Sequence, residues 1–285
     1  MYERFCKEKK LSELSTFGIG GIARYFIEVK DVQTIQAVLQ FCTNERLPFL
    51  VVGKGSNCLF SDTGFDGLVI ANKIDFIEEE PDLQIYVGAG TSFSLLGTQT
   101  AKKGLSGLEF AAGIPASVGG AIYMNAGAQG QDTQTSLVEV EFVDEQGVLH
   151  RLNKSQMQFG YRSSPFQKMK GVIVAARFQL QSKPEARKEQ LDLLQYRIHT
   201  QPYHEKSAGC VFRNPQGHSA GSLIDKAGLK GVKIGGASVS EMHANFLINK
   251  EGATSQDVKR LIALVQHTVK EKYGVELETE IRIWE

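Results

Sequence analysis

A short glycine-containing loop is the first segment whose residue types could do chemistry. An apolar run ends at Val52, and Gly53, Gly55, Ser56 and Asn57 follow it. Two glycines one residue apart let backbone N–H groups turn toward one point, and serine and asparagine add side-chain donors. Such a nest suits a pyrophosphate, although an ordinary tight turn uses the same residue types. The dinucleotide fingerprint is excluded, because it needs a third glycine at position 58, where the chain has cysteine.

A second tract, residues 107–130, is rich in glycine and alanine and carries few charges. Small residues contribute little to core packing, so such a tract is useful where the backbone must approach something large and flat. A planar cofactor ring is one candidate. A helix packed tightly through its small residues is the alternative that composition alone favours.

The first half of the chain has the pattern of a strand-rich domain that would support these loops. Short β-type runs bounded by turn residues are typical of strands. They occur at Tyr25–Val29, Pro48–Val52, Leu68–Ala71, Gln84–Val87, Val138–Phe142 and Val148–Leu152. The last two runs flank a turn at residues 144–147, which predicts a hairpin. One amphipathic helix is predicted after Asp31, with its apolar face running from Val32 to Cys42.

The second half of the chain predicts a smaller α+β unit. A charged helix is expected at residues 185–198, and we place a domain boundary just before it, between 183 and 184. A second helix begins after Thr254, whose hydroxyl can act as the N-cap, and stops at Gly274. Strands are expected at residues 232–234, 245–249 and 275–284.

Composition and charge exclude several classes of protein. The 32 basic and 32 acidic residues balance, which excludes a broad electrostatic surface for nucleic acid or anionic lipid. Four cysteines lie far apart without a C-x-x-C spacing, so we predict no metal site and no disulfide framework. The first 30 residues lack the apolar core of a signal peptide, and no apolar run reaches the roughly 20 residues of a membrane span. We therefore expect a soluble cytoplasmic protein.

Seven segments carry a resemblance to one family, in order along the chain. They are residues 15–26, 53–62, 107–130, 160–166, 208–215, 220–231 and 277–283. With these segments the sequence resembles the UDP-N-acetylenolpyruvoylglucosamine reductases, flavoproteins that make UDP-N-acetylmuramate for peptidoglycan. The resemblance covers nearly the whole chain, from Ser15 to Ile283.

The resemblance implies an α+β fold with two functional parts. An FAD-binding domain of the vanillyl-alcohol oxidase and p-cresol methylhydroxylase type would cover residues 1–183, with subdomains at 1–72 and 73–183. A small substrate-binding domain would cover residues 184–285. The family binds FAD noncovalently and takes its hydride from NADPH, and we expect a monomer. The segment between Phe166 and Gly209 is short, as in the family's shorter form, so the residues that hold the uridine end of the substrate stay unassigned.

The resemblance also implies which residues hold the cofactor. The first loop would hold the FAD pyrophosphate through Gly53, Lys54, Gly55, Ser56 and Asn57. The second tract would line the flavin through Gly113, Ile114, Pro115, Ala116, Ser117, Gly119 and Gly120.

Arg162 and Glu280 match two catalytic positions of the family. Reduced flavin delivers hydride to an enolpyruvyl ether, and negative charge develops on the substrate carboxylate. The guanidinium fork of Arg162 can hold that carboxylate, and Glu280 is its acidic partner in stabilising the enol form. Without the motif, a structural or surface arginine and an exposed edge-strand carboxylate would be the commoner interpretations.

Cys210 departs from the family pattern, which most often has serine at this position. The serine donates the proton that completes the reduction, and a thiol with a reference pKa of about 8.5 is a better acid than an alcohol. A buried structural cysteine is the alternative. Tyr161, Asn214 and His243 match other positions that could line the substrate site.

Two other functions stay open on the residues alone. One is another flavin oxidoreductase of the same fold class that acts on a sugar or an alcohol. The other is a nucleotide-sugar binder without enzymatic activity, which would carry no flavin.

Overall fold

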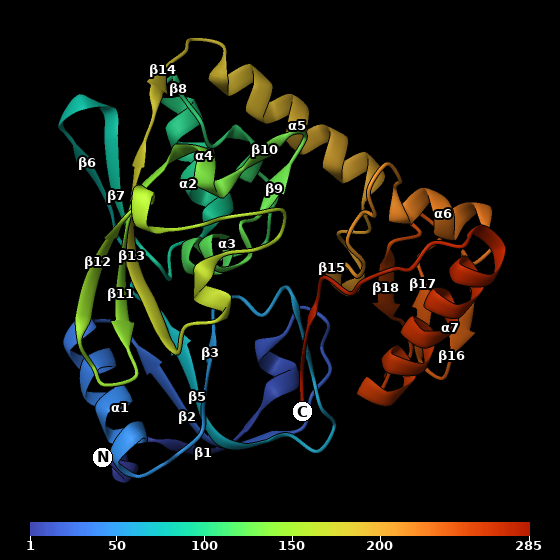
Figure 1. The fold of residues 1–285 in the computed structure, drawn as a ribbon, viewed down its shortest axis with the longest axis horizontal. Helices are drawn as coiled ribbons and strands as arrows, with labels where there is room; N and C mark the ends of the chain where they lie inside the picture. The colour runs from blue at the N-terminus through green and yellow to red at the C-terminus, as the bar shows by residue number, and fades with distance from the viewer. The chain divides into compact units, whose positions relative to one another are not determined.

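A computed structural model describes all residues, 1–285, and the chain divides into two compact units that alternate along the sequence (Figure 1). The first unit comprises Met1–Cys6, Tyr25–Lys54 and Gly67–Arg197. The second unit comprises Lys7–Arg24, Gly55–Asp66 and Ile198–Glu285. The boundary predicted between residues 183 and 184 separates an FAD-binding from a substrate-binding domain. The two compact units do not test this assignment of function, so the boundary stays a prediction.

A five-stranded antiparallel sheet with the order β12-β11-β13-β7-β6 lies in the first unit (Figure 1). Its strands are β6 (Ile77–Glu80), β7 (Gln84–Gly88), β11 (Leu137–Asp144), β12 (Leu149–Asn153) and β13 (Gly171–Gln179). The predicted hairpin is confirmed, because β11 pairs with β12 across a turn in which Asp144 Oδ1 accepts hydrogen bonds from two backbone N–H groups. Strand β13 was not predicted; it is buried along most of its length.

A four-stranded sheet has the order β1-β2-β5-β3. Its strands are β1 (Cys6–Lys10), β2 (Ile22–Val29), β3 (Phe49–Val52) and β5 (Phe65–Asn72). The first unit also has two short antiparallel pairs: β8 (Leu105–Ser106) with β14 (Gln181–Ser182), and β9 (Gly127–Ala128) with β10 (Gln131–Asp132).

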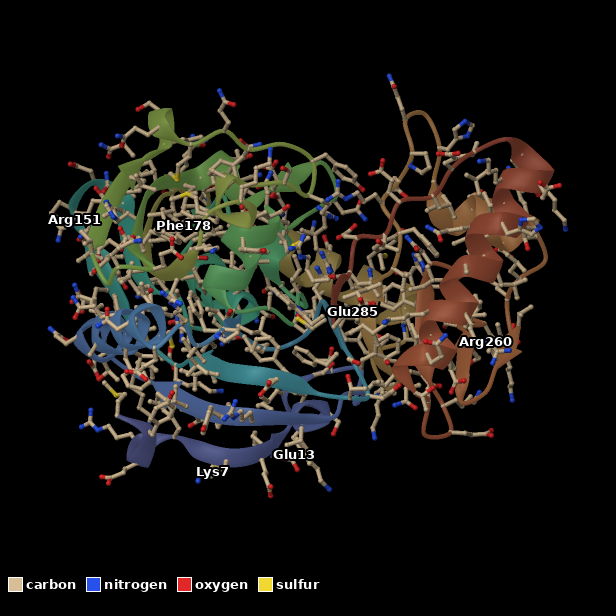
Figure 2. The ribbon with its side chains drawn as sticks, turned by 60° about the horizontal axis from the view of Figure 1, so that its bottom comes forward. Lys7, Glu13, Arg151, Phe178, Arg260 and Glu285 are labelled. Carbon is tan, nitrogen blue, oxygen red and sulfur yellow. The ribbon has the colours of Figure 1, made fainter.

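The first unit contains four α-helices and most of a fifth. They are α1 (Val32–Asn44), α2 (Phe93–Lys102), α3 (Val118–Met124), α4 (Thr133–Ser136) and α5 (Ala186–Thr200). The last three residues of α5 belong to the second unit. Helix α1 confirms the prediction, since the Asp31 side chain accepts a hydrogen bond from Thr34 N at 2.7 Å and its apolar face packs against β5, β11 and β13. A second core joins α2 and α3 to the five-stranded sheet around residues such as the fully buried Phe178 (Figure 2).

The second unit has an antiparallel sheet of its own, with the order β15-β18-β17-β16. Its strands are β15 (Lys206–Cys210), β16 (Lys233–Ile234), β17 (Ala237–Val239) and β18 (Phe246–Asn249), and its helices are α6 (Ala220–Lys226) and α7 (Ser255–Tyr273). Helix α7 begins with a capping box formed by Thr254 and Asp257 and ends at Gly274, whose φ is +68°. Both of its ends were predicted.

The predicted strand over residues 275–284 is wrong for most of its length. Only β19 (Arg282–Trp284) is a strand, and it pairs in parallel with β4 (Cys58–Phe60). Residues 278–280 instead hydrogen-bond to residues 211–213, through Arg213 N to Glu278 O and Glu280 N to Val211 O. The segment therefore changes partner near residue 281, which breaks the continuous ladder that alternation in the sequence suggests.

No helix of the protein combines the length and the apolar character that crossing a membrane requires. The four cysteines form no disulfide.

Candidate functional site

In the first unit, the start of the predicted pyrophosphate loop lies against the start of helix α3. A Cβ atom on Gly53 would come within 2.2 Å of Ser117 Oγ. Ser117 is itself nearly inaccessible and caps α3, with its Oγ accepting a hydrogen bond from Gly120 N at 3.2 Å. The absence of a side chain at position 53 therefore lets two segments, about 60 residues apart in sequence, come together.

Lys54 brings a positive charge to this place. Its Nζ donates a hydrogen bond to Ser92 Oγ at 2.7 Å. Partial desolvation lowers the pKa of Lys54, and the nearby charge of Lys73 adds to the effect, while Asp75 opposes it. The negative charge of an anion bound next to Lys54 would offset both unfavourable contributions.

The glycines of the second tract differ in what surrounds them. Gly113 has a φ of +79°, and its N–H donates to Ser94 Oγ at 2.8 Å. Gly119 packs against the protein, since its Cβ would lie 3.0 Å from Ala89 Cβ. A Cβ on Gly120 would meet only Ser117 Oγ, at 3.3 Å. Packing within the protein therefore explains Gly119 and leaves Gly120 unexplained.

The three residues between Gly113 and Ser117 form a loop at the surface of the first unit. Pro115 is exposed, and Ile114 and Ala116 are half-buried. Ala116 O accepts a hydrogen bond from Phe93 N at 3.0 Å, which ties the loop to the start of α2.

The other half of the predicted pyrophosphate loop belongs to the second unit. Gly55 has a φ of +62°, and a Cβ there would lie 1.8 Å from Leu14 O, so close packing against the backbone already requires glycine. Ser56 is half-buried. The Asn57 side chain donates to Glu280 O at 3.3 Å, and Asn57 O accepts from Arg282 N at 2.9 Å. Asn57 therefore holds the C-terminal segment on both sides of residue 281.

Arg162 lies in a tight turn of the first unit. Gly160 and Ser163 exchange backbone hydrogen bonds of 3.0 and 3.1 Å, which leaves Tyr161 and Arg162 at the tip. The φ of Arg162 is +54°, in the left-handed region that side chains with a Cβ seldom adopt. Its Nη2 donates to Gly127 O at 2.9 Å, and its guanidinium carbon lies 5.1 Å from the centre of the exposed Tyr161 ring.

In the second unit, Cys210 and Glu280 are both next to Val211, Cys210 along the chain and Glu280 through a backbone hydrogen bond. Gly209, with a φ of +76°, accompanies an irregularity in the pairing of β15 with β18 just before Cys210. Glu280 N donates to Val211 O at 2.7 Å, so the backbones of residues 211 and 280 are neighbours. Both Cys210 and Glu280 are half-buried. The backbones of two of the three predicted catalytic residues thus lie on neighbouring segments of the second unit, and the third, Arg162, belongs to the first unit.

Asn245 is a polar residue near this pair that the sequence analysis missed. Its side chain accepts a hydrogen bond from Phe212 N at 2.9 Å and donates one to Phe212 O at 2.8 Å. Its own carbonyl accepts from Val211 N at 2.8 Å. Only 3% of Asn245 is exposed, so an asparagine at the start of an apolar strand was the available signal. Through these bonds Asn245 fixes the backbone that follows Cys210.

His243 and Asn214 have well-defined partners in the second unit. His243 Nδ1 accepts a hydrogen bond from Asn245 N at 3.2 Å, and desolvation lowers the pKa of His243. Its ring is therefore neutral near pH 7, with the proton on Nε2. Asn214 is exposed, and its Oδ1 accepts from Ala220 N at 3.0 Å, at the start of α6.

Comparison with known proteins decides the family. The UDP-N-acetylenolpyruvoylglucosamine reductase of Protochlamydia amoebophila is 59% identical over 272 residues, which cover 95% of this chain and 91% of that protein. The chain belongs to the UDP-N-acetylenolpyruvoylglucosamine reductase family. The reductase of Chlamydia trachomatis serovar A is 50% identical over 96% of this chain and 94% of that protein. The crystal structure of the Thermus caldophilus reductase superposes with a TM-score of 0.84 at 35% identity and covers 99% of both chains.

Two family models match separate parts of the chain. Residues 23–153 match an FAD binding domain, and residues 201–284 match the C-terminal domain of UDP-N-acetylenolpyruvoylglucosamine reductase. The predictions of this reductase family, of an α+β fold with a second C-terminal domain and of FAD as cofactor are confirmed. The residues around Gly53, Lys54 and Gly120 fit such a cofactor, because they combine a positive charge with a helix edge that has no side chain. The roles of individual residues stay predictions.

Proposed function

We propose that this chain reduces UDP-N-acetylglucosamine enolpyruvate to UDP-N-acetylmuramate with NADPH and noncovalent FAD, in the synthesis of peptidoglycan precursors. Family membership over nearly the whole length supports the substrate class. The observation that carries the proposal is the placement of Cys210 and Glu280 beside Val211 in the unit that includes the reductase-specific domain. When bound, FAD would supply the redox chemistry, which is the transfer of a hydride from NADPH to the terminal carbon of the enolpyruvyl group.

The protein's own groups handle the charge and the proton. The Arg162 guanidinium binds the substrate carboxylate and stabilises the negative charge that develops there. Glu280 is its acidic partner in stabilising the enol form. Cys210 donates a proton from Sγ to the carbon next to the one that receives the hydride. One hydride and one proton together convert the enolpyruvyl ether into a lactyl ether.

Binding residues complete the proposal. The backbone of residues 53–57 and the Lys54 charge hold the FAD pyrophosphate, and residues 113–120 line the flavin. Tyr161, Asn214 and His243 contact the substrate, and the neutral His243 ring offers Nε2–H as a donor. We place the reaction in the cytoplasm, where UDP-sugars and NADPH are found, and expect a monomer because one chain supplies every proposed group.

The test is the visible spectrum of the purified protein under anaerobic conditions. We expect a flavin spectrum that NADPH bleaches and that UDP-N-acetylglucosamine enolpyruvate restores. All of the yellow colour should leave the protein on denaturation, because the flavin is noncovalent. A colourless protein that binds UDP-sugars would identify a nucleotide-sugar binder. Bleaching without recovery would indicate a flavin oxidoreductase with another substrate.

A further inference from the structure

The backbone of Arg162 is held by a side chain that the proposed mechanism does not use. Gln167 ends the short 3-10 helix Pro165–Gln167, and its Nε2 donates to Arg162 O at 3.1 Å. The same nitrogen donates to Tyr123 O at 3.0 Å. Both amide hydrogens of Gln167 are therefore committed, one to the Arg162 turn and one to helix α3.

The second acceptor of Gln167, Tyr123 O, belongs to a helix and accepts more than one side-chain hydrogen bond. It lies in the last turn of α3, where carbonyl groups lack a partner within the helix. It also accepts a hydrogen bond from Ser164 Oγ at 2.7 Å. The Gly160 side of the turn is tied to the same helix end, because Asn125, the C-cap of α3, donates from Nδ2 to Gly160 O at 2.9 Å.

The hydrogen bonds to the turn stabilise it in spite of the unfavourable backbone conformation of Arg162. A residue with a Cβ at a φ of +54° would relax toward the common regions unless its surroundings hold it. The carbonyl bond to Gln167 fixes the peptide plane that follows Arg162, and the Nη2 bond to Gly127 O fixes the far end of its side chain. The backbone and the guanidinium are thus constrained separately, and Gln167 supplies the side-chain constraint on the backbone.

We propose that Gln167 is a positioning residue for Arg162, and that its amide sets the direction in which the guanidinium meets the substrate carboxylate. The inference rests on the function proposed above for Arg162. Gln167 acts through the Arg162 carbonyl and has no contact with the reacting atoms in this assignment. Its loss should therefore affect only the half-reaction in which Arg162 acts.

Anaerobic stopped-flow measurements on the flavin-loaded enzyme test this inference. We expect Gln167→Ala to slow flavin reoxidation by the enolpyruvyl substrate by about 10- to 100-fold, as small misplacements of a catalytic group do. Flavin reduction by NADPH should keep its wild-type rate. The double variant with Arg162→Ala should be as slow as Arg162→Ala alone, because the two residues act through one contact.

Ser164→Ala is the matched control. It removes a hydrogen bond to the same Tyr123 carbonyl and leaves the Gln167 bond to Arg162 in place. Equal slowing by Ser164→Ala, or multiplication of the Gln167 and Arg162 effects in the double variant, would overturn the inference and indicate a general role in the fold. An Arg162→Ala enzyme with unchanged reoxidation would refute the role of Arg162 itself, and the role of Gln167 with it.

Gln167→Met is a second variant that tests the inference if Gln167→Ala does not fold. Methionine keeps the length of the side chain and suits its neighbour, Met124 Sδ, which lies 3.7 Å from Gln167 Nε2. It cannot donate to either carbonyl, so the same selective slowing is expected. If neither variant binds flavin, Gln167 is required for the fold, and the inference is wrong.

Discussion

Replacement of Gly120 by alanine tests whether position 120 needs a glycine in order to bind a ligand or in order to pack within the protein. Gly120 is in the first turn of α3, and its φ is not in the left-handed region. An added Cβ would meet only Ser117 Oγ, at 3.3 Å. Alanine is the better helix former by about 0.8–1.0 kcal/mol. The gain in helix propensity opposes the small shift that Ser117 Oγ must make, so the free energy of unfolding of flavin-stripped Gly120→Ala should differ from wild type by no more than about 1 kcal/mol.

Flavin binding should change in the opposite direction. If the cofactor lies against the open side of Gly120, the new methyl group overpacks that contact at a cost of about 1–3 kcal/mol. This cost corresponds to a Kd for FAD that is about 5- to 150-fold higher. Fluorescence titration of the flavin-stripped protein with FAD measures the Kd, and denaturant unfolding of the same sample measures the stability.

Gly119→Ala is the matched control one residue earlier in the helix. Its Cβ would lie 3.0 Å from Ala89 Cβ and 3.2 Å from Ala89 O, so overpacking occurs within the protein itself. We expect it to lower the free energy of unfolding of the flavin-stripped protein by about 1–3 kcal/mol. A Gly120→Ala protein that binds FAD as tightly as wild type would refute the reasoning, because this edge of α3 would then not face the cofactor.

Three further predictions concern the other site residues. Arg162→Ala and Glu280→Gln should slow flavin reoxidation by substrate about 10²–10³-fold and leave flavin reduction by NADPH unchanged in stopped flow; equal slowing of both half-reactions would indicate a structural role. Because the pKa of His243 is lowered in the folded protein, the unfolded chain binds a proton below about pH 6.5 that the folded protein does not bind, so the free energy of unfolding falls as the pH drops through this range. His243→Gln should reduce this dependence of the free energy of unfolding on pH, measured by denaturant unfolding. Burial raises the pKa of Cys42 and of Cys58 to about 11, so iodoacetamide at about pH 8 should modify the exposed Cys6 and the half-buried Cys210 while sparing those two, and substrate should protect Cys210 alone in peptide mass mapping.

Local signals in the sequence were sufficient to predict several elements of the fold. Asp31 and Thr254 cap helices α1 and α7 as predicted, because a cap depends on residues within one turn of it. The hairpin of β11 and β12 was also predicted, since Asp144 and Gly147 form its turn. These features need no knowledge of distant segments.

Features that depend on distant partners were not predicted. The C-terminal segment alternates like one strand, yet it pairs first with residues 211–213 and then with β4, and only the folded chain offers those two partners. The sequence likewise could not tell that Gly55 is required by Leu14, whereas the packing around Gly120 leaves its identity open. Asn245 and Gln167 hydrogen-bond to backbone groups 33 and 44 residues away, which no short motif reveals.

The measurement that tests the account most directly is reoxidation of the NADPH-reduced enzyme by UDP-N-acetylglucosamine enolpyruvate in wild type, Cys210→Ser and Cys210→Ala. The account predicts that Cys210→Ser keeps activity, because a hydroxyl at this position can also donate the proton. Cys210→Ala should bind flavin and oxidise NADPH normally but reoxidise more slowly by several orders of magnitude, about 10²–10⁴-fold or more. Reoxidation of Cys210→Ala at the wild-type rate would contradict the account, because another group or water would then supply the proton.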